Sequence, residues 1–171
     1  MPEAVKQQAG YEDLYTIPEN ATGQIIDGEL IVTPRPSVRH SNAATSLGGE
    51  IIAPYRFGRG GPGGWIILYA TEIMFAEQLL VPDLAGWREE RFPGEPRENW
   101  ISVVPDWVCE ILSPTTAKLD KVRKMPIYGQ HGVAHLWLID PAIKTLDVFR
   151  LEAGKWLLLA AFADDDKVRA E

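Results

Sequence analysis

The chain has 171 residues, of which 46% are hydrophobic and 24% charged, which is typical of one soluble globular domain with a sizeable core. Its single cysteine excludes an internal disulfide, no apolar run approaches the roughly 20 residues that span a bilayer, and the N-terminus lacks the basic-then-apolar order of a signal peptide. We therefore expect one cytoplasmic domain over residues 1–171 that has no membrane partner. The net charge of −7 argues against broad attraction to nucleic acid or lipid, but it does not exclude a nuclease, whose active site must itself be acidic.

The first 34 residues predict a tail, a short helix and a hairpin. Residues 1–10 favour a loose tail, and the next ten favour a short helix that ends before Pro18. Residues 23–34 contain two apolar, β-branched runs around Asp27-Gly28, which is the strongest two-residue turn signal. We therefore predict a hairpin that turns at these two residues.

A helix and two strands are predicted next. Ser37 can cap a helix whose apolar residues recur at three- and four-residue spacing, although two glycines and Pro54 weaken the pattern. These apolar residues are Ala44, Leu47, Ile51 and Tyr55. Residues 58–64 (GRGGPGG) must form a turn, and the runs 65–75 and 78–87 each predict one strand.

The last third predicts a strand, a helix, a strand and a hairpin. Residues 102–113 favour a strand, and a helix is expected from Thr115 or Thr116 towards Gly132, kinked or split by Pro126. Residues 135–140 favour a strand, and residues 144–162 a hairpin that turns at Ala153-Gly154. Because the crossover between the strands at 103–112 and 135–140 contains a helix, we expect them to be parallel, in an α/β or α+β fold.

Two carboxylates stand out because they interrupt apolar strands. Side chains alternate faces along a strand, so Glu110 would share a face with Val108 and Leu112, while Cys109 would face away from it. A buried carboxylate costs several kcal/mol unless it is paired or binds a metal. Asp83 lies in the preceding strand, and two such oxygen ligands on adjacent strands are what a Mg²⁺ or Mn²⁺ site needs.

A basic residue could complete this site. Lys124 lies on the helix that follows the Glu110 strand, and a helix that packs back on the sheet can aim it at the same place. A lysine there could orient a water or stabilise charge on a phosphate. Asp120 and Lys124 are also spaced to pair with each other.

Each of these residues also has a simpler interpretation. Asp83 could lie at a solvated strand end, and Lys124 could be an ordinary surface lysine. Taken together, the two carboxylates and the basic helix favour a site, but their spacing alone leaves both interpretations open.

Several longer stretches resemble a known family. VPDLAGW and PDWVCEILSPTTAKLDKVRKMPIYGQHGVAHLWLIDPAIKTLDVFRL are similar to the putative restriction endonuclease family, once catalogued as a domain of unknown function, within the PD-(D/E)XK nuclease superfamily. The upstream IIDGELIVTPRPSVRHSNAATSLGGEI also resembles that family's first segment, so the similarity covers residues 11–151. It implies a restriction-endonuclease-like core: a helix, a three-stranded meander, a second helix and a parallel strand.

The resemblance also implies roles for individual residues. Asp83 matches the aspartate of the Pro-Asp motif and Glu110 the second acidic residue, so both would bind metal, with the backbone carbonyl of Ile111 as a further ligand. The superfamily's lysine normally lies two residues after that acid, where this chain has Leu112. Lys124 on the following helix is the matching basic residue instead.

Three further residues match less specific parts of the family pattern. Glu29, at the first hairpin, and His40, near the start of the first helix, would line the same cleft, with His40 either taking part directly or making an ordinary structural hydrogen bond. Asp120 would hold Lys124.

The sequence therefore predicts Mg²⁺-dependent hydrolysis of phosphodiester bonds in nucleic acid, with DNA as the expected substrate and Mn²⁺ as a possible substitute. Because an acidic domain would grip DNA weakly alone, a homodimer or an accessory protein partner is expected. The hairpin at 146–162 has an edge that could form such an interface, or it merely completes the sheet.

Two alternatives to a nuclease stay open. The loss of the usual lysine at Leu112 also suits an inactive relative that acts as a binding or assembly module. A glycoside hydrolase with a carboxylate pair is disfavoured because no run of aromatic residues beside the carboxylates suggests a sugar cleft.

Overall fold

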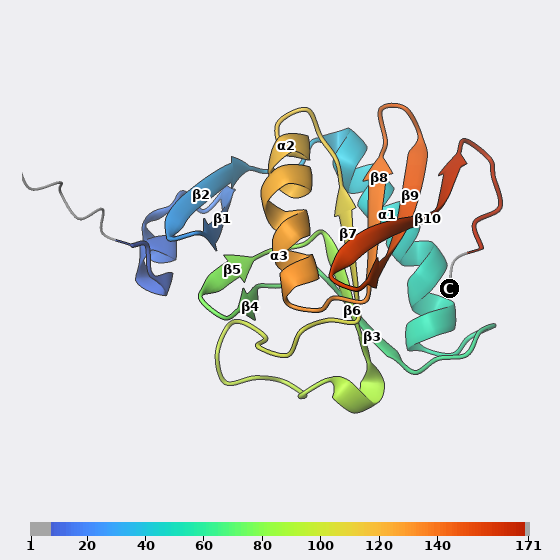
Figure 1. Ribbon diagram of the computed structural model, residues 1–171, viewed down its shortest axis with the longest axis horizontal. Coiled ribbons are helices and arrows are strands. Elements are labelled where there is room, and N and C mark those ends of the chain that lie inside the picture. Colours follow the sequence, from blue (N-terminus) through green and yellow to red (C-terminus); the bar gives the residue numbers. More distant parts are fainter. Residues whose placement is uncertain (1–7, 170–171) are drawn as a thin grey trace, which may run out of the picture.

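Two sheets organise residues 8–169, which are the residues that the computed structural model describes (Figure 1). The six-stranded sheet has the order β10 (Lys155–Ala163), β9 (Thr145–Glu152), β8 (His135–Asp140), β7 (Trp107–Ile111), β6 (Leu84–Arg88), β3 (Trp65–Tyr69). The four-stranded sheet has the order β2 (Glu29–Pro34), β1 (Ala21–Ile26), β5 (Gln78–Leu80), β4 (Ile73–Phe75).

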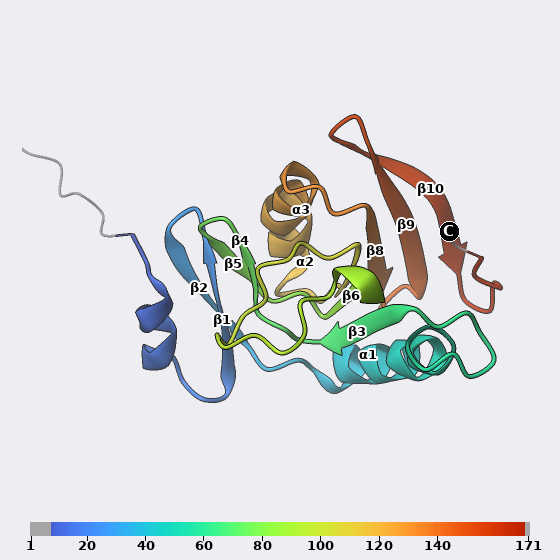
Figure 2. The ribbon, with the colours of Figure 1, turned by 90° about the horizontal axis from the view of Figure 1, so that it is seen from below.

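Helices cover both faces of the larger sheet (Figure 2). One face carries α1 (Val38–Ile51), which continues as the π-helical segment η2 (Ile52–Arg56). The other face carries a continuous helix of three segments, α2 (Ala117–Leu119), η4 (Asp120–Lys124) and α3 (Met125–Gln130). Two short 3₁₀ helices, η1 (Tyr11–Thr16) and η3 (Glu89–Arg91), complete the helices of residues 8–169.

The alternation of side chains along β7 divides the core into two clusters. Trp107, Cys109 and Ile111 pack with Ala44 beneath α1, whereas Val108 on the opposite face belongs to the cluster under α3. Glu110 shares this second face and is buried there. The predicted division of the β7 side chains between two faces is therefore confirmed.

Both predicted hairpins form at the predicted turns. Asp27 and Gly28 join β1 to β2 with φ angles of 52° and 74°, and Ala153 and Gly154 join β9 to β10 with 47° and 74°. Positive φ at both central residues matches the right-handed twist of the flanking strands. The parallel pairing of β7 with β8 is also confirmed.

Two predicted strands are wrong, because each of them divides into two shorter strands. This division changes the element to which Asp83 belongs. Residues 65–75 form β3 and β4 in different sheets, because the chain turns at Ala70, whose φ is 47°. Residues 78–87 likewise divide into β5 and β6, joined by Val81–Asp83, where Pro82 has no N–H for a ladder. Asp83 thus lies in the link that enters β6, rather than inside a strand.

The predictions for residues 102–132 need smaller corrections. The strand covers only β7, because Pro105 precedes it and the chain turns away after Ile111. Pro126 does not split the following helix. The preceding turn η4 is π-helical instead, and this turn accommodates the backbone hydrogen bond that Pro126 cannot donate.

The arrangement agrees with the predicted restriction-endonuclease-like core: α1, the meander β3–β6–β7, the helix α2–α3 and the parallel strand β8. The β4–β5 hairpin is an insertion that extends the N-terminal hairpin into the second sheet. Most of the predicted tail lies outside the described residues, while Ala9 within it donates a hydrogen bond to the Gly28 carbonyl. No helix in residues 8–169 is long and apolar enough to cross a membrane.

Gly86 tests how tightly β6 and β7 are held together. A Cβ at this position would lie 3.2 Å from the rings of both Trp65 and Trp107, which leaves no room for a larger side chain. We expect Gly86→Val to lower the free energy of unfolding by about 1–3 kcal/mol, measured by urea denaturation. Gly49→Val is the control, because a Cβ there meets no atom within 4 Å and should change stability little. Equal stability of the two variants would contradict this packing.

Candidate active site

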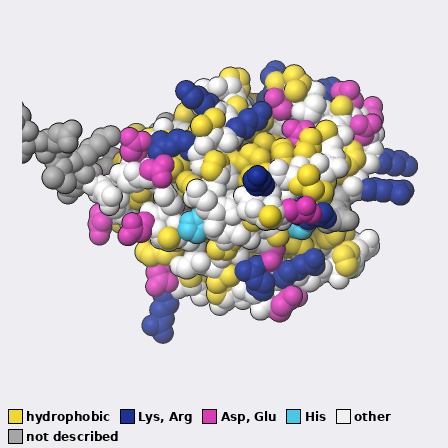
Figure 3. Space-filling view, viewed as in Figure 1, with side chains coloured by type: hydrophobic (Ala, Val, Ile, Leu, Met, Phe, Trp, Pro, Cys, Tyr) yellow, Lys and Arg dark blue, Asp and Glu magenta, His cyan; other side chains and the backbone are white. Residues whose placement is uncertain are grey.

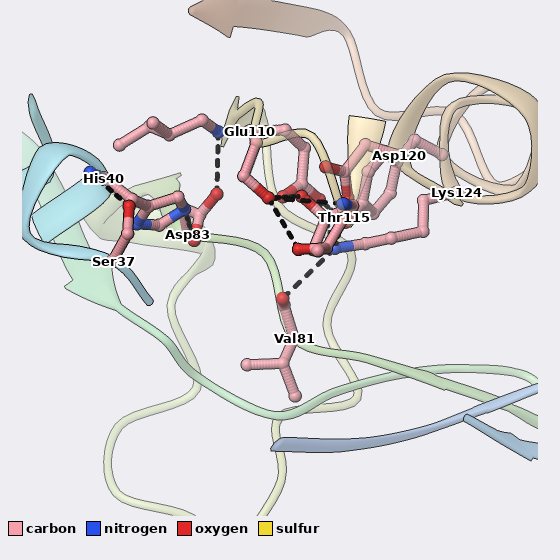
Figure 4. A network of polar contacts seen from close by, with 12 residues as sticks. Ser37, His40, Val81, Asp83, Glu110, Thr115, Asp120 and Lys124 are labelled. Atoms are coloured by element: carbon pink, nitrogen blue, oxygen red, sulfur yellow. Dashed lines mark hydrogen bonds and ion pairs between the residues drawn. The ribbon is translucent and has the colours of Figure 1, made fainter. Parts of the chain in front are cut away.

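The predicted acidic and basic residues meet at one cavity of about 360 Å³ between the two sheets. His40 reaches it from α1, Asp83 from the link before β6, and Glu110 from β7. Asp120 and Lys124 reach it from η4 (Figure 4). The structure thus brings together residues that lie up to 84 positions apart in the sequence.

Asp83 is held by contacts to both of its carboxylate oxygens. Its Oδ2 accepts a 2.7 Å hydrogen bond from the backbone N–H of Ile111, and its Oδ1 lies 3.0 Å from His40 Nε2. The first contact ties the link before β6 to the end of β7, and the second ties it to α1. The orientation of Asp83 is therefore fixed by two separate elements.

His40 owes its position to the start of α1. Ser37 caps this helix, since its Oγ accepts a hydrogen bond from the His40 backbone N–H at 3.3 Å. The imidazole points inward and is buried. Its hydrogen bond with Asp83 raises the pKa of His40, burial opposes this shift, and the backbone of Ile111 adds to the increase.

Glu110 and Lys124 form a buried ion pair. Both side chains are almost inaccessible, and Lys124 Nζ lies 2.7 Å from Glu110 Oε1. The same ammonium lies 3.4 Å from Asp120 Oδ1 and donates a 3.2 Å hydrogen bond to the Val81 carbonyl. Tyr128 Oη also donates to Glu110 Oε1. Both of these contacts, from Lys124 and from Tyr128, are made to Oε1 of Glu110.

Burial is the main cause of the pKa shifts of the acidic side chains in this cavity. Burial raises the pKa of Glu110 to about 8, and the charges of Asp120 and Asp83 add to the shift while Lys124 opposes it. The pKa of Asp120 is raised as well, again chiefly by burial. Burial works to lower the pKa of Lys124, but the attraction of Glu110 and Asp120 outweighs it and raises that pKa. Lys124 is therefore charged.

The remaining predicted residues lie in different surroundings. Glu29 is not among the residues that line the cavity, and its carboxylate contacts Arg123 at 3.0 Å. Leu112, at the usual lysine position, packs in the core under α3. The position beside Glu110 belongs to Lys124 instead.

Sequence reasoning missed two groups that hold this network. Tyr128 follows Lys124 by four residues, so the helical period places both on one face, and this spacing could have revealed its contact with Glu110. The Val81 carbonyl has no comparable signal, because a backbone acceptor can be assigned only from the folded chain.

The donor set fits a small divalent cation that keeps part of its water shell. No group of three or more His, Cys, Asp or Glu side chains in residues 8–169 is arranged to hold a metal by itself. Mg²⁺, however, is commonly bound by one or two carboxylates together with waters. Asp83 and Glu110 line one cavity, and each raises the local negative charge that such an ion would offset.

The sequence matches one family model over nearly its whole length. The Uma2 family, described as "Putative restriction endonuclease", matches residues 9–171. The chain belongs to this family. The predicted resemblance is therefore confirmed, and family membership indicates a nuclease-type protein.

A solved structure shares the fold. The chain is 24% identical to a protein from Anabaena variabilis ATCC 29413 described as "a putative nuclease belonging to DUF820". The match covers 94% of this chain and 87% of that chain, with a TM-score of 0.75, and it supports the restriction-endonuclease-like fold. No curated protein matches the chain.

The buried ion pair generates a pH-dependent prediction. Lys124→Met leaves Glu110 buried without its cation, which should lower the free energy of unfolding by about 3–5 kcal/mol at pH 8. The folded pKa of Glu110, about 8, lies above its ordinary value, so the folded state binds more protons and stability falls as pH rises between these two values. At pH 5 Glu110 is protonated with or without Lys124, whereas from about pH 8 the lysine stabilises its ionised form, so urea denaturation in EDTA should show a smaller loss at pH 5 than at pH 8.

The double variant Glu110→Gln with Lys124→Met is the control, because it removes both charges. It should recover much of the stability and lose most of the pH dependence. A single variant as stable as the native protein at pH 8 would show that the pair is not needed to bury Glu110.

Proposed function

We propose that this protein is a metal-dependent nuclease that hydrolyses phosphodiester bonds in nucleic acid, with DNA as the substrate and Mg²⁺ as the natural ion. The observation that carries the proposal is the convergence of Asp83, Glu110 and Lys124 on one cavity in a chain of a restriction endonuclease family. Mn²⁺ is expected to substitute, because it favours the same carboxylate and water ligands.

Asp83 and Glu110 would hold the ion, with the Ile111 carbonyl as a further oxygen ligand. When bound, the ion would lower the pKa of a coordinated water and neutralise charge on the scissile phosphate. His40 positions Asp83 through its 3.0 Å contact and, being buried, keeps that carboxylate from rotating.

Lys124 would supply the positive charge at the reacting phosphate. Its ammonium is charged, buried and already aimed at Glu110 Oε1, so a short movement of this flexible side chain would bring it to a water or a phosphate oxygen. Asp120 positions Lys124 from the same helix. In hydrolysis the water oxygen attacks phosphorus, the P–O ester bond breaks, and the leaving oxygen takes a proton.

The surface charge bears on how substrate is held. Acidic and basic side chains are interspersed across the face shown in Figure 3, in keeping with the net charge of −7. Because one acidic chain would bind DNA weakly, we expect a homodimer or an accessory protein to strengthen binding. β10 is an edge strand whose Leu157 and Leu158 are 44% and 52% exposed, and it offers an interface for a second copy. The buried single cysteine suits the cytoplasm.

Isosteric replacement of the carboxylates tests the proposal. Asp83→Asn and Glu110→Gln should each reduce Mg²⁺-dependent cleavage of plasmid DNA by roughly 100-fold or more, because metal catalysis supplies several kcal/mol of transition-state stabilisation. Glu29→Gln is the matched control, since this carboxylate lies outside the cavity and contacts Arg123. Full cleavage by both cavity variants, with unchanged circular dichroism, would remove the proposed site.

A second candidate is an inactive relative that acts as a binding or assembly module. It is favoured by the contacts themselves, because Lys124 neutralises Glu110 and protein groups contact both oxygens of Asp83 without any ion. In such a protein the network would serve stability alone.

Calorimetric titration with Mn²⁺ separates the two candidates. A nuclease should bind Mn²⁺ through Asp83 and Glu110, and Asp83→Asn should abolish the binding heat while Glu29→Gln preserves it. Absence of any Mn²⁺ binding by the native protein at pH 8 would favour the inactive module.

A further inference from the structure

A second hollow lies directly beside the candidate site, on the α1 side of the large sheet. It has a volume of about 540 Å³ and is lined by Ala44, Thr45, Gly48, Gly49, Arg59 and Tyr69, among others. We call it the α1 groove. Figure 2 shows α1 running beside β3, the strand that ends at Tyr69.

The groove adjoins the candidate active site. Tyr69 lines both hollows, and the α1 residues that face them follow one another along the helix, with His40 in the first and Ala44 and Gly48 in the second. From His40 to Gly49 the helix rises roughly 14 Å. At the roughly 3.4 Å spacing of stacked bases, this length accommodates about four nucleotides.

The chemistry of the groove suits a polyanion that carries flat rings. Tyr69 is 53% exposed and lines both hollows, so its ring is open to stacking by a flat group. Arg59, at the other end, is the only charged residue among the lining residues and has no carboxylate partner within residues 8–169. Its guanidinium lies 5.3 Å from the centre of the Phe57 ring, which holds it at the groove.

We infer that the α1 groove binds a single strand of nucleic acid that leads into the cavity of Asp83 and Glu110. A base stacks on Tyr69 beside the scissile phosphate, and Arg59 contacts a phosphate further along the strand. Gly48 and Gly49 allow the strand to approach the helix backbone, and the groove carries positive charge in a protein that is acidic overall. The inference rests on the proposed function, which supplies the reason for the strand to enter the cavity.

Gly49 allows a test by charge alone. This residue is exposed, and an added Cβ meets no atom within 4 Å, so either Gly49→Glu or Gly49→Lys would project into the groove without disturbing the fold. Both variants replace a glycine in a helix by a better helix former, so their stabilities should match. Any difference in binding between them then reports the sign of the charge.

The measurement is fluorescence anisotropy of a labelled twelve-nucleotide DNA strand, in EDTA so that no cleavage occurs. Gly49→Glu should weaken binding at least fivefold relative to Gly49→Lys, and Tyr69→Ala should weaken it about 5- to 150-fold. Arg59→Ala should lower the salt dependence, the slope of log K against log salt, by about 0.7. Arg97→Ala is the control, because it removes an exposed charge that lines neither hollow.

Matched RNA and duplex probes complete the experiment. Sensitivity of either the DNA strand or the RNA strand to Gly49→Glu supports the groove and identifies the sugar it accepts. Equal affinities of Gly49→Glu, Gly49→Lys and the native protein for both strands, or tighter binding of the duplex with no effect of Gly49→Glu, would overturn the inference.

The two proposals fail in different ways. Unchanged cleavage by Gly49→Glu, together with unchanged strand binding, would remove the groove and leave the nuclease. Groove-dependent strand binding by a protein that cleaves nothing in Mg²⁺ or Mn²⁺ would support the groove and remove the nuclease.

Discussion

The buried contact between Lys124 and Glu110 is the interaction on which the candidate site depends. Neither charge could be buried alone, because an unpaired ion in the core costs several kcal/mol. The same ammonium reaches Asp120 on its own helix and the carbonyl of Val81, two residues before Asp83. One side chain therefore connects the acidic strand β7, the helix that covers it and the link that carries the second acid. This connection adds to the apolar packing of Ile127 and Tyr128 that docks the helix on the sheet.

Charge in the cavity remains unbalanced even with this contact. Asp83, Glu110 and Asp120 share one lysine, and burial together with their mutual repulsion keeps the pKa of Glu110 at about 8 despite the ammonium beside it. A network built only for stability would gain from fewer acids, since replacing buried ions by apolar residues is often neutral or stabilising. Under the proposed function, a bound cation would offset the charge of these carboxylates and so give them a role beyond stability.

Local signals in the sequence predicted the elements and the chemistry, but not the division of strands between the sheets. The signals that act within a few residues could be recognised directly. These are the turns at Asp27-Gly28 and Ala153-Gly154, the alternation along β7 and the capping Ser37. The breaks at Ala70 and Pro82 separate strands that pair with distant partners, and no local pattern states which sheet a short apolar strand will join. Glu110 was predictable from its apolar strand, and Lys124 from the helix that follows this strand together with the family resemblance. The contacts of Asp83 with His40 and of Lys124 with Val81 could be assigned only from the folded structure.

The acidic character of the chain and a nucleic acid substrate are compatible if attraction is local. At physiological salt, exposed charges more than about 8 Å apart are largely screened, so a phosphate responds to the side chains nearest to it rather than to the net charge of −7. Arg35 lines the cavity of the carboxylates, and Arg59 lines the groove beside it. Under the proposed function, these two arginines would give the substrate positive contacts near the carboxylates. Binding would then be weak in the absence of an ion and would strengthen when the ion offsets the carboxylates, which couples substrate affinity to a cavity that is ready to react.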